Sequence, residues 1–224
     1  MIYSPQFILS EMLGLFAGLI SIVLGARFLI KYTKDKSSIQ LFTGLSIVGI
    51  GWVLVLFFIR ALRPNDALLL TIIGLIGIWF LFPFSGVLAL NLMGVKDWKL
   101  FSVFLFLVSF IHMGLFFREA VVLRQEIMEA LYLGSAFYVF ESLFLLTALI
   151  VLIIALVSGL FFYFSKITSG TMRKKSLYLG TGFLLMLSLS FDLLGYMIEF
   201  LPLIRGIELA GVILIYIGFS VEVR

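Results

Sequence analysis

Residues 149–164 read LIVLIIALVSGLFFYF, a run without a single charged side chain. With its flanks the run extends over about 139–165, and about 20 apolar residues are enough to cross the hydrocarbon core of a bilayer as a helix. Backbone N–H and C=O groups find no water in hydrocarbon, so they must be satisfied within the helix itself. The stretch therefore predicts a membrane-spanning α-helix.

The whole chain has the composition that this stretch implies. Of its 224 residues, 63% are hydrophobic and 12% are charged, and the mean hydropathy is +1.25. Soluble domains are about half apolar and about a quarter charged, so a globule of this size could not bury the surplus. The composition excludes a soluble domain, and it makes the lipid bilayer the first expected partner, with the chain as a multi-pass protein of the cell membrane.

Seven apolar segments are long enough to cross a bilayer. We therefore predict an all-α, polytopic integral membrane protein whose single domain, 1–224, is a bundle of seven transmembrane helices. The spans are expected at about 7–30, 39–60, 67–93, 100–117, 139–165, 176–200 and 202–221.

The segment between the fourth and fifth spans has a different pattern. Residues 118–137 read REAVVLRQEIMEALYLGSAF, and on a helical wheel most apolar side chains share one side, opposite Arg118, Gln125, Glu126 and Glu129. Such a pattern is typical of an amphipathic helix that lies in the membrane interface. An interfacial helix is therefore predicted here, with the alternative that the segment extends the fourth or fifth span.

Basic residues are divided unevenly between the two ends of the predicted bundle. The first, third and fifth loops and the C-terminal end hold eleven of the sixteen, including every lysine, and the opposite side holds five arginines. Short loops rich in Lys and Arg mark the cytoplasmic side, so the N-terminus is predicted outside and the C-terminus in the cytoplasm. Placed beside a membrane, the net charge of +4 needs no nucleic-acid partner. The basic inner loops are instead the expected contact for a cytoplasmic signalling partner.

Two short segments indicate an internal repeat. Residues 38–44, SIQLFTG, align with residues 176–182, SLYLGTG, and each opens an outward-running span after basic residues. Parallel three-helix repeats are a plan that some transporters use. We treat 1–93 and 139–221 as hypothetical repeats joined by the fourth span.

Acidic residues gather in the outer half of the predicted bundle, where nine of the twelve fall. A charge that faces lipid near the bilayer centre costs roughly 3 kcal/mol or more, so ionisable residues in spans usually face the bundle interior or water. The sole histidine lies in the outer third of the fourth span. We predict an outward-opening, acid-lined cavity for a small ligand or cation, with any metal left undetermined. The predicted lining residues are Asp192, Glu208, Glu141, Glu11 and His112.

Helical spacing supports an inward orientation of these acids. In the sixth span, Ser188, Asp192, Gly195 and Glu199 recur at steps of four, three and four and form one stripe. In the first span, a stripe of small residues starts at Glu11 and includes a GxxxG that permits close helix contact. Such stripes of small residues can also pack against a second copy of the chain, so a homo-oligomer is a further expected partner. Arg205 and Glu208 are three residues apart, a spacing that favours an ion pair.

A purely structural interpretation of the same residues stays open. Glu11, Glu141 and Glu199 lie close to span ends, and their carboxylates can extend to the interface. Arginines on the same side can neutralise the acids as structural ion pairs: Arg60, Arg63, Arg118 and Arg205. His112 can equally join two helices by a hydrogen bond.

The residues argue against several chemistries. A retinal protein needs a Schiff-base lysine inside a span, and no predicted span contains a lysine. One histidine and no cysteine cannot supply the ligands of a zinc hydrolase. No Gly-rich phosphate loop occurs in the cytoplasmic segments. We therefore predict that the protein is not an enzyme and uses no cofactor.

Two functions remain. The first is a receptor-like or sensory membrane module, in which the outer cavity binds a small ligand or cation and the basic inner face contacts a partner. The second is a transporter or channel for a cation, proton or small polar solute that uses the intramembrane acids. The repeat favours the second, whereas the almost wholly apolar inner half of the fifth span favours the first.

Overall fold

The structure is a computed structural model that describes residues 5–63, 66–122, 141–188, 190 and 200–220. Within these ranges the chain forms seven α-helices and no β-strand. Six of the helices are long and apolar enough to cross a membrane. The predicted all-α fold is therefore confirmed, and the six apolar helices indicate a multi-pass membrane protein.

The helix boundaries follow the apolar segments of the sequence. The helices are α1 (Pro5–Asp35), α2 (Ser38–Leu62), α3 (Ala67–Leu92), α4 (Trp98–Val122), α6 (Glu141–Ile167), α7 (Gly170–Leu185) and α9 (Leu201–Ser220). The sixth predicted span, 176–200, differs from the others because α7 ends at Leu185 and most of the remaining residues of that span lie outside the described ranges. The seventh crossing stays a prediction.

The fourth helix is longer than its predicted span. It runs from Trp98 to Val122 instead of 100–117, so it takes in the first five residues of the segment predicted to be interfacial. The rest of that segment, 123–140, lies outside the described residues, and the interfacial helix stays a prediction.

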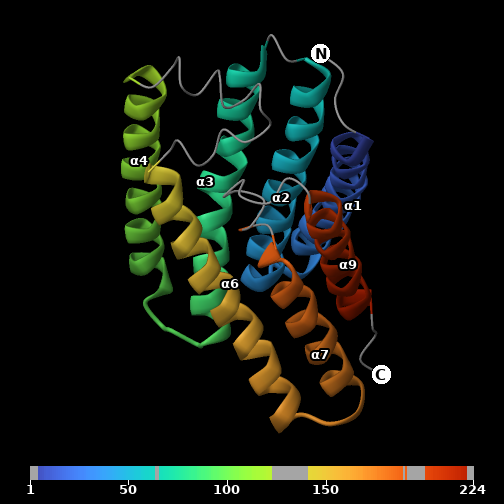
Figure 1. The fold of residues 1–224 in the computed structure, drawn as a ribbon. Helices are drawn as coiled ribbons and strands as arrows, with labels where there is room; N and C mark the ends of the chain where they lie inside the picture. The colour runs from blue at the N-terminus through green and yellow to red at the C-terminus, as the bar shows by residue number, and fades with distance from the viewer. Residues whose placement is uncertain (1–4, 64–65, 123–140, 189, 191–199, 221–224) are drawn as a thin grey trace.

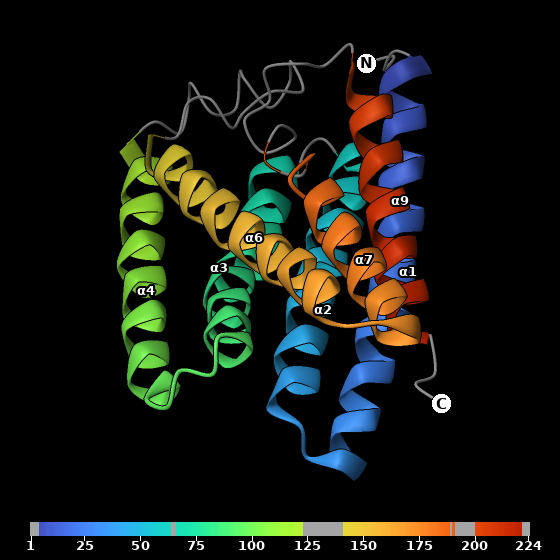
Figure 2. The same ribbon diagram turned by 90° about the horizontal axis from the view of Figure 1, so that it is seen from below.

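The helices form two triplets, α1–α2–α3 and α6–α7–α9, and each triplet packs in the same order. In the first, α2 lies between α1 and α3, and in the second, α7 lies between α6 and α9. The triplets meet where α1 packs on α9 and where α3 packs on α6, and α4 packs on α3 and α6 from outside. In both views α4 stands at one edge of the bundle, and α1 and α9 lie side by side at the other (Figure 1, Figure 2). The large apolar core around α2 and α3 includes Leu54, Phe57, Leu75 and Ile78.

Glycines set the closest helix contacts. A Cβ on Gly51 of α2 would lie 2.7 Å from the carbonyl oxygen of Gly18 in α1, and one on Gly182 of α7 would lie 2.9 Å from that of Gly211 in α9. Only glycine lets two helix backbones come this near. The small-residue stripe of α1 is thus used inside the chain, because Gly18 faces α2. A homo-oligomer remains a prediction.

The two segments aligned in the repeat hypothesis can be compared by the contacts of their glycines. The packing order is shared by the triplets, but the glycines of the two aligned segments face different neighbours. Gly44 of α2 lies against Gly25 of α1, the preceding helix, whereas Gly182 of α7 lies against Gly211 of α9, the following helix. The aligned residues Gly44 and Gly182 therefore do not make equivalent contacts. The repeat stays a hypothesis.

Candidate functional site

A buried ion pair forms on α9. The Arg205 Nη1 atom lies 3.0 Å from Oε2 of Glu208, one helical turn away, and the two side chains are 1% and 0% exposed. Residues three apart share a helix face, so the predicted pairing of these two residues is confirmed. A hydrogen bond between a guanidinium and a carboxylate is stronger than one between neutral groups.

The first helix covers this pair. A Cβ on Gly14 would lie 3.3 Å from Nε of Arg205, so the glycine leaves room for the guanidinium against α1. Glu11 is three residues before Gly14, on the same face of α1, and its side chain is buried. The sequence prediction that Glu11 and Glu208 turn inward is consistent with this burial.

A second buried cation enters from α2. Arg60 donates a 3.5 Å hydrogen bond from Nη1 to Oγ1 of Thr71 in α3, and its Cζ lies 4.7 Å from the centre of the Phe57 ring. The ring face attracts the guanidinium, and Thr71 is completely buried. Arg60 is therefore held in place by both α2 and α3.

The register of the helices places the two arginines within about 8 Å of each other along α1. Gly18 of α1 faces Gly51 of α2, and these helices are antiparallel. Arg60 is nine residues after Gly51 and so lies level with residue 9 of α1, two positions from Glu11, or about 3 Å at 1.5 Å per residue. Arg205 contacts α1 at Gly14, only one turn deeper than Glu11.

Together these residues form a buried polar layer at the end of the bundle where α1 begins. None is more than 9% exposed, and each has at least one further interaction. We call this set the polar layer: Ser10, Glu11, Arg60, Thr71, Arg205 and Glu208. Four of the six are ionisable, and ionisable groups inside a membrane bundle are expensive to bury and commonly mark functional sites.

Two of the predicted site residues cannot be placed. Asp192, with its stripe neighbour Glu199, lies outside the described residues. Glu141 begins α6, but its side chain is outside the described part as well. Their membership of the site stays a prediction.

His112 lies in a different contact. It is buried on α4, and its Nδ1 accepts a 2.9 Å hydrogen bond from Nε1 of Trp79 in α3. Ser109, one turn before it, donates from its hydroxyl to the carbonyl oxygen of Trp79. Because α4 packs on α3 and α6 and stands opposite α1 and α9, the structure does not bring His112 to the polar layer (Figure 2). The alternative role, a hydrogen bond between two helices, describes the observed contact.

Replacing Trp79 with phenylalanine should therefore loosen α4. The smaller ring would keep the edge-on contact that Trp79 makes with Phe116, but it cannot donate to His112, and an abandoned buried acceptor costs about 1–3 kcal/mol. Thermal unfolding in detergent would measure the loss. Trp52→Phe is the matched control, because Trp52 donates to a backbone carbonyl of α3 from a partly exposed position. Equal losses in both variants would refute a special role for the Trp79–His112 bond.

Sequence reasoning underestimated the cations and missed the hydroxyls of the layer. Arg60 and Arg205 were expected only as neutralising partners, yet both are buried, and Arg205 as deeply as the acids. Ser10 and Thr71 carried no signal, because a hydroxyl in a helix often bonds its own backbone. Knowledge of the α2–α3 register was needed to find the Arg60–Thr71 contact.

Among the described residues, no three His, Asp or Glu side chains converge as a group that could hold a metal ion. Comparison with protein-family models, with curated proteins and with solved structures finds no match for this chain. The class is therefore defined by the fold and the site alone: a helical multi-pass membrane protein with a buried layer of acids and arginines at one end.

Proposed function

We propose that the chain is a receptor-like or sensory module of the cell membrane that binds a small ligand or cation at the polar layer. The observation that carries the proposal is the burial of Glu11, Arg60, Arg205 and Glu208 toward the end of an apolar bundle where α1 begins. Burying ionised groups costs several kcal/mol per ion, and simple packing would be served as well by apolar side chains. Ligand recognition would explain why these ionisable side chains are buried despite that cost.

The orientation of the module follows from its charges. Seven spans, an outer N-terminus and a cytoplasmic C-terminus put the polar layer on the outer side and the lysines inside. Lys166, Arg173 and Lys174 at the α6–α7 connection are exposed, so they are available to a cytoplasmic signalling partner. The predicted interfacial helix would then lie on the outer side, between α4 and α6.

The interior beyond the layer favours binding over transport. Ile47, Leu54, Leu75 and Leu81 are at most 2% exposed and fill the bundle between the polar layer and the basic end. Large aliphatic side chains in this position oppose a continuous polar route. A receptor requires only a binding site, without a polar route through the bundle to the basic end.

The proposal predicts that Asp192 takes part in binding. The predicted Ser188 stripe includes Asp192, and in the acid-lined cavity predicted from the sequence its carboxylate would add a charge for a cation. We expect Asp192→Asn to abolish the rise in melting temperature that Na⁺, K⁺, Mg²⁺ or Ca²⁺ chloride gives to the wild type in detergent, with choline chloride as the ionic-strength control. Asp66→Asn makes the same chemical change at an exposed residue of the same end. If one of these cations stabilises wild type and Asp192→Asn equally, Asp192 has no part in the site.

Transport is the second candidate, favoured by the shared packing order of α1–α3 and α6–α9. Parallel repeats of this kind occur in transporters. Proteoliposomes loaded with a pH-sensitive or Na⁺-sensitive dye separate the two functions. Sustained flux that Glu208→Gln removes would establish transport. If wild-type vesicles show no more proton or Na⁺ flux than protein-free vesicles, the receptor function is favoured.

A further inference from the structure

A groove between α1 and α9 runs from the middle of α1 toward the basic end of the bundle. It has a volume of 310 Å³ and is lined by Leu19, Ile20, Val23, Leu24, Arg27 and Tyr216. Arg27 is sixteen residues beyond Glu11, or about 24 Å along α1. The charged end of the groove is therefore a separate feature at the basic end of the bundle, and its role does not depend on the proposed function.

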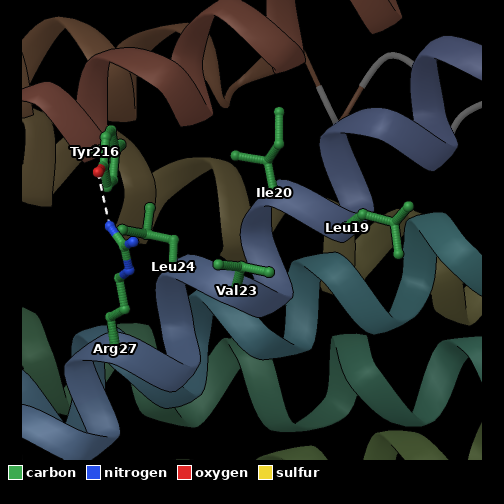
Figure 3. A pocket seen from close by; sticks show the side chains of 6 residues that line it. All are labelled: Leu19, Ile20, Val23, Leu24, Arg27 and Tyr216. Carbon is green, nitrogen blue, oxygen red and sulfur yellow. Dashed lines mark hydrogen bonds between the residues drawn. The ribbon is translucent and has the colours of Figure 1, made fainter.

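The two ends of the groove differ in chemistry. Arg27 and Tyr216 close one end, where the guanidinium donates a 2.7 Å hydrogen bond to the Tyr216 hydroxyl and lies 5.5 Å from its ring centre (Figure 3). Leu19 and Ile20 lie at the other end, where they are 47% and 36% exposed. A guanidinium has five N–H donors in a planar fork, so Arg27 can hold Tyr216 and still offer donors to an anion.

Two lysines add positive charge beside Arg27. Lys31 follows it by one turn on the same face of α1, and Lys175 reaches over from α7, with Nζ 5.9 Å from the ring centre of Phe219. Burial and then the positive charge of Lys31 lower the pKa of Lys175 from its ordinary value. Cations that repel one another in this way would be relieved by an anion placed between them.

We propose that this groove binds one anionic phospholipid, with its phosphate held by Arg27, Lys31 and Lys175 and one acyl chain lying along Leu19, Ile20 and Val23. The charge of the basic end and the apolar lining of the groove match the two parts of that molecule. A phosphate without a chain matches only the first, and a zwitterionic lipid offers the cations no net negative charge. Basic clusters beside a membrane recognise anionic headgroups in this manner.

The test compares lipids that share their acyl chains. Purified protein in detergent is titrated with palmitoyl-oleoyl phosphatidylglycerol or phosphatidylcholine, and binding is followed by native mass spectrometry and by melting temperature. We expect tighter binding of phosphatidylglycerol, weakened about fivefold for each cation removed in Arg27→Gln and Lys175→Gln. Lys99→Gln is the matched control, because Lys99 is an exposed lysine near the same end, on α4. Inorganic phosphate at the same concentration should not displace the lipid.

A second variant tests the groove itself with all charges intact. Val23 is 58% exposed, so Val23→Trp should fold normally while it fills the groove and weakens phosphatidylglycerol binding. The proposal is overturned if phosphatidylcholine binds as tightly, if Lys99→Gln loses as much affinity as Arg27→Gln, if free phosphate competes, or if Val23→Trp binds like the wild type.

Discussion

Replacing Gly51 with alanine is expected to destabilise the protein by about 1–3 kcal/mol, although the same change normally favours a helix. The added Cβ would lie 2.7 Å from the Gly18 carbonyl oxygen and 2.7 Å from Cγ1 of Ile22. One of these atoms belongs to a backbone, so relief requires α1 and α2 to move apart. Because α2 also packs on α3, that movement would disturb the centre of the bundle.

Gly114→Ala is the matched control for this prediction. Gly114 lies within α4, and nothing is within 4 Å of the position that its Cβ would take. Alanine should therefore show its intrinsic helix advantage there, up to about 1 kcal/mol. Thermal or denaturant unfolding in detergent should shift in opposite directions for the two variants. A Gly51→Ala protein as stable as wild type would contradict the close contact between α1 and α2.

Removing the carboxylate of Glu208 is expected to have the largest effect. Glu208→Ala takes away the partner 3.0 Å from Arg205, whose side chain is 1% exposed. Breaking a buried ion pair from one side typically costs about 3–5 kcal/mol, because the remaining buried charge loses a neutralising partner. The variant should unfold at a markedly lower temperature or denaturant concentration.

The double variant Arg205→Met, Glu208→Leu separates charge from packing. It removes both charges and keeps apolar volume, and such replacements are often neutral or stabilising. We expect the double variant to be more stable than Glu208→Ala alone. If the double variant is as unstable as the single one, the loss arises from packing around α9 and not from an uncompensated guanidinium.

Much of the fold was predictable because each span carries its own signal. The absence of charge over 149–164 predicts α6 without knowledge of any other segment, since backbone groups in hydrocarbon can only bond within a helix. The end of α4 was not predictable, since residues 118–122 fit an interfacial helix and a continued span equally well. Only coordinates show that α4 continues to Val122.

The candidate site was predictable by residue type and not by arrangement. Helical spacing indicated the Arg205–Glu208 pair, because residues three apart meet without help from other helices. Spacing within one helix says nothing about which helices become neighbours, so His112 could not be separated from Glu11 and Glu208. The position of α4 outside the two triplets decided that question.

The sequence by itself determined that the chain is helical and membrane-spanning, and where most of its helices begin and end, because these properties depend on local hydrophobicity and backbone hydrogen bonding. The tertiary structure alone decided which polar groups meet. Glycine contacts such as Gly18–Gly51 fix the register between helices, and that register brings Arg60 close to the depth of Glu11 and turns Arg205 against Gly14. Side chains from different helices can be matched only after the helices have packed.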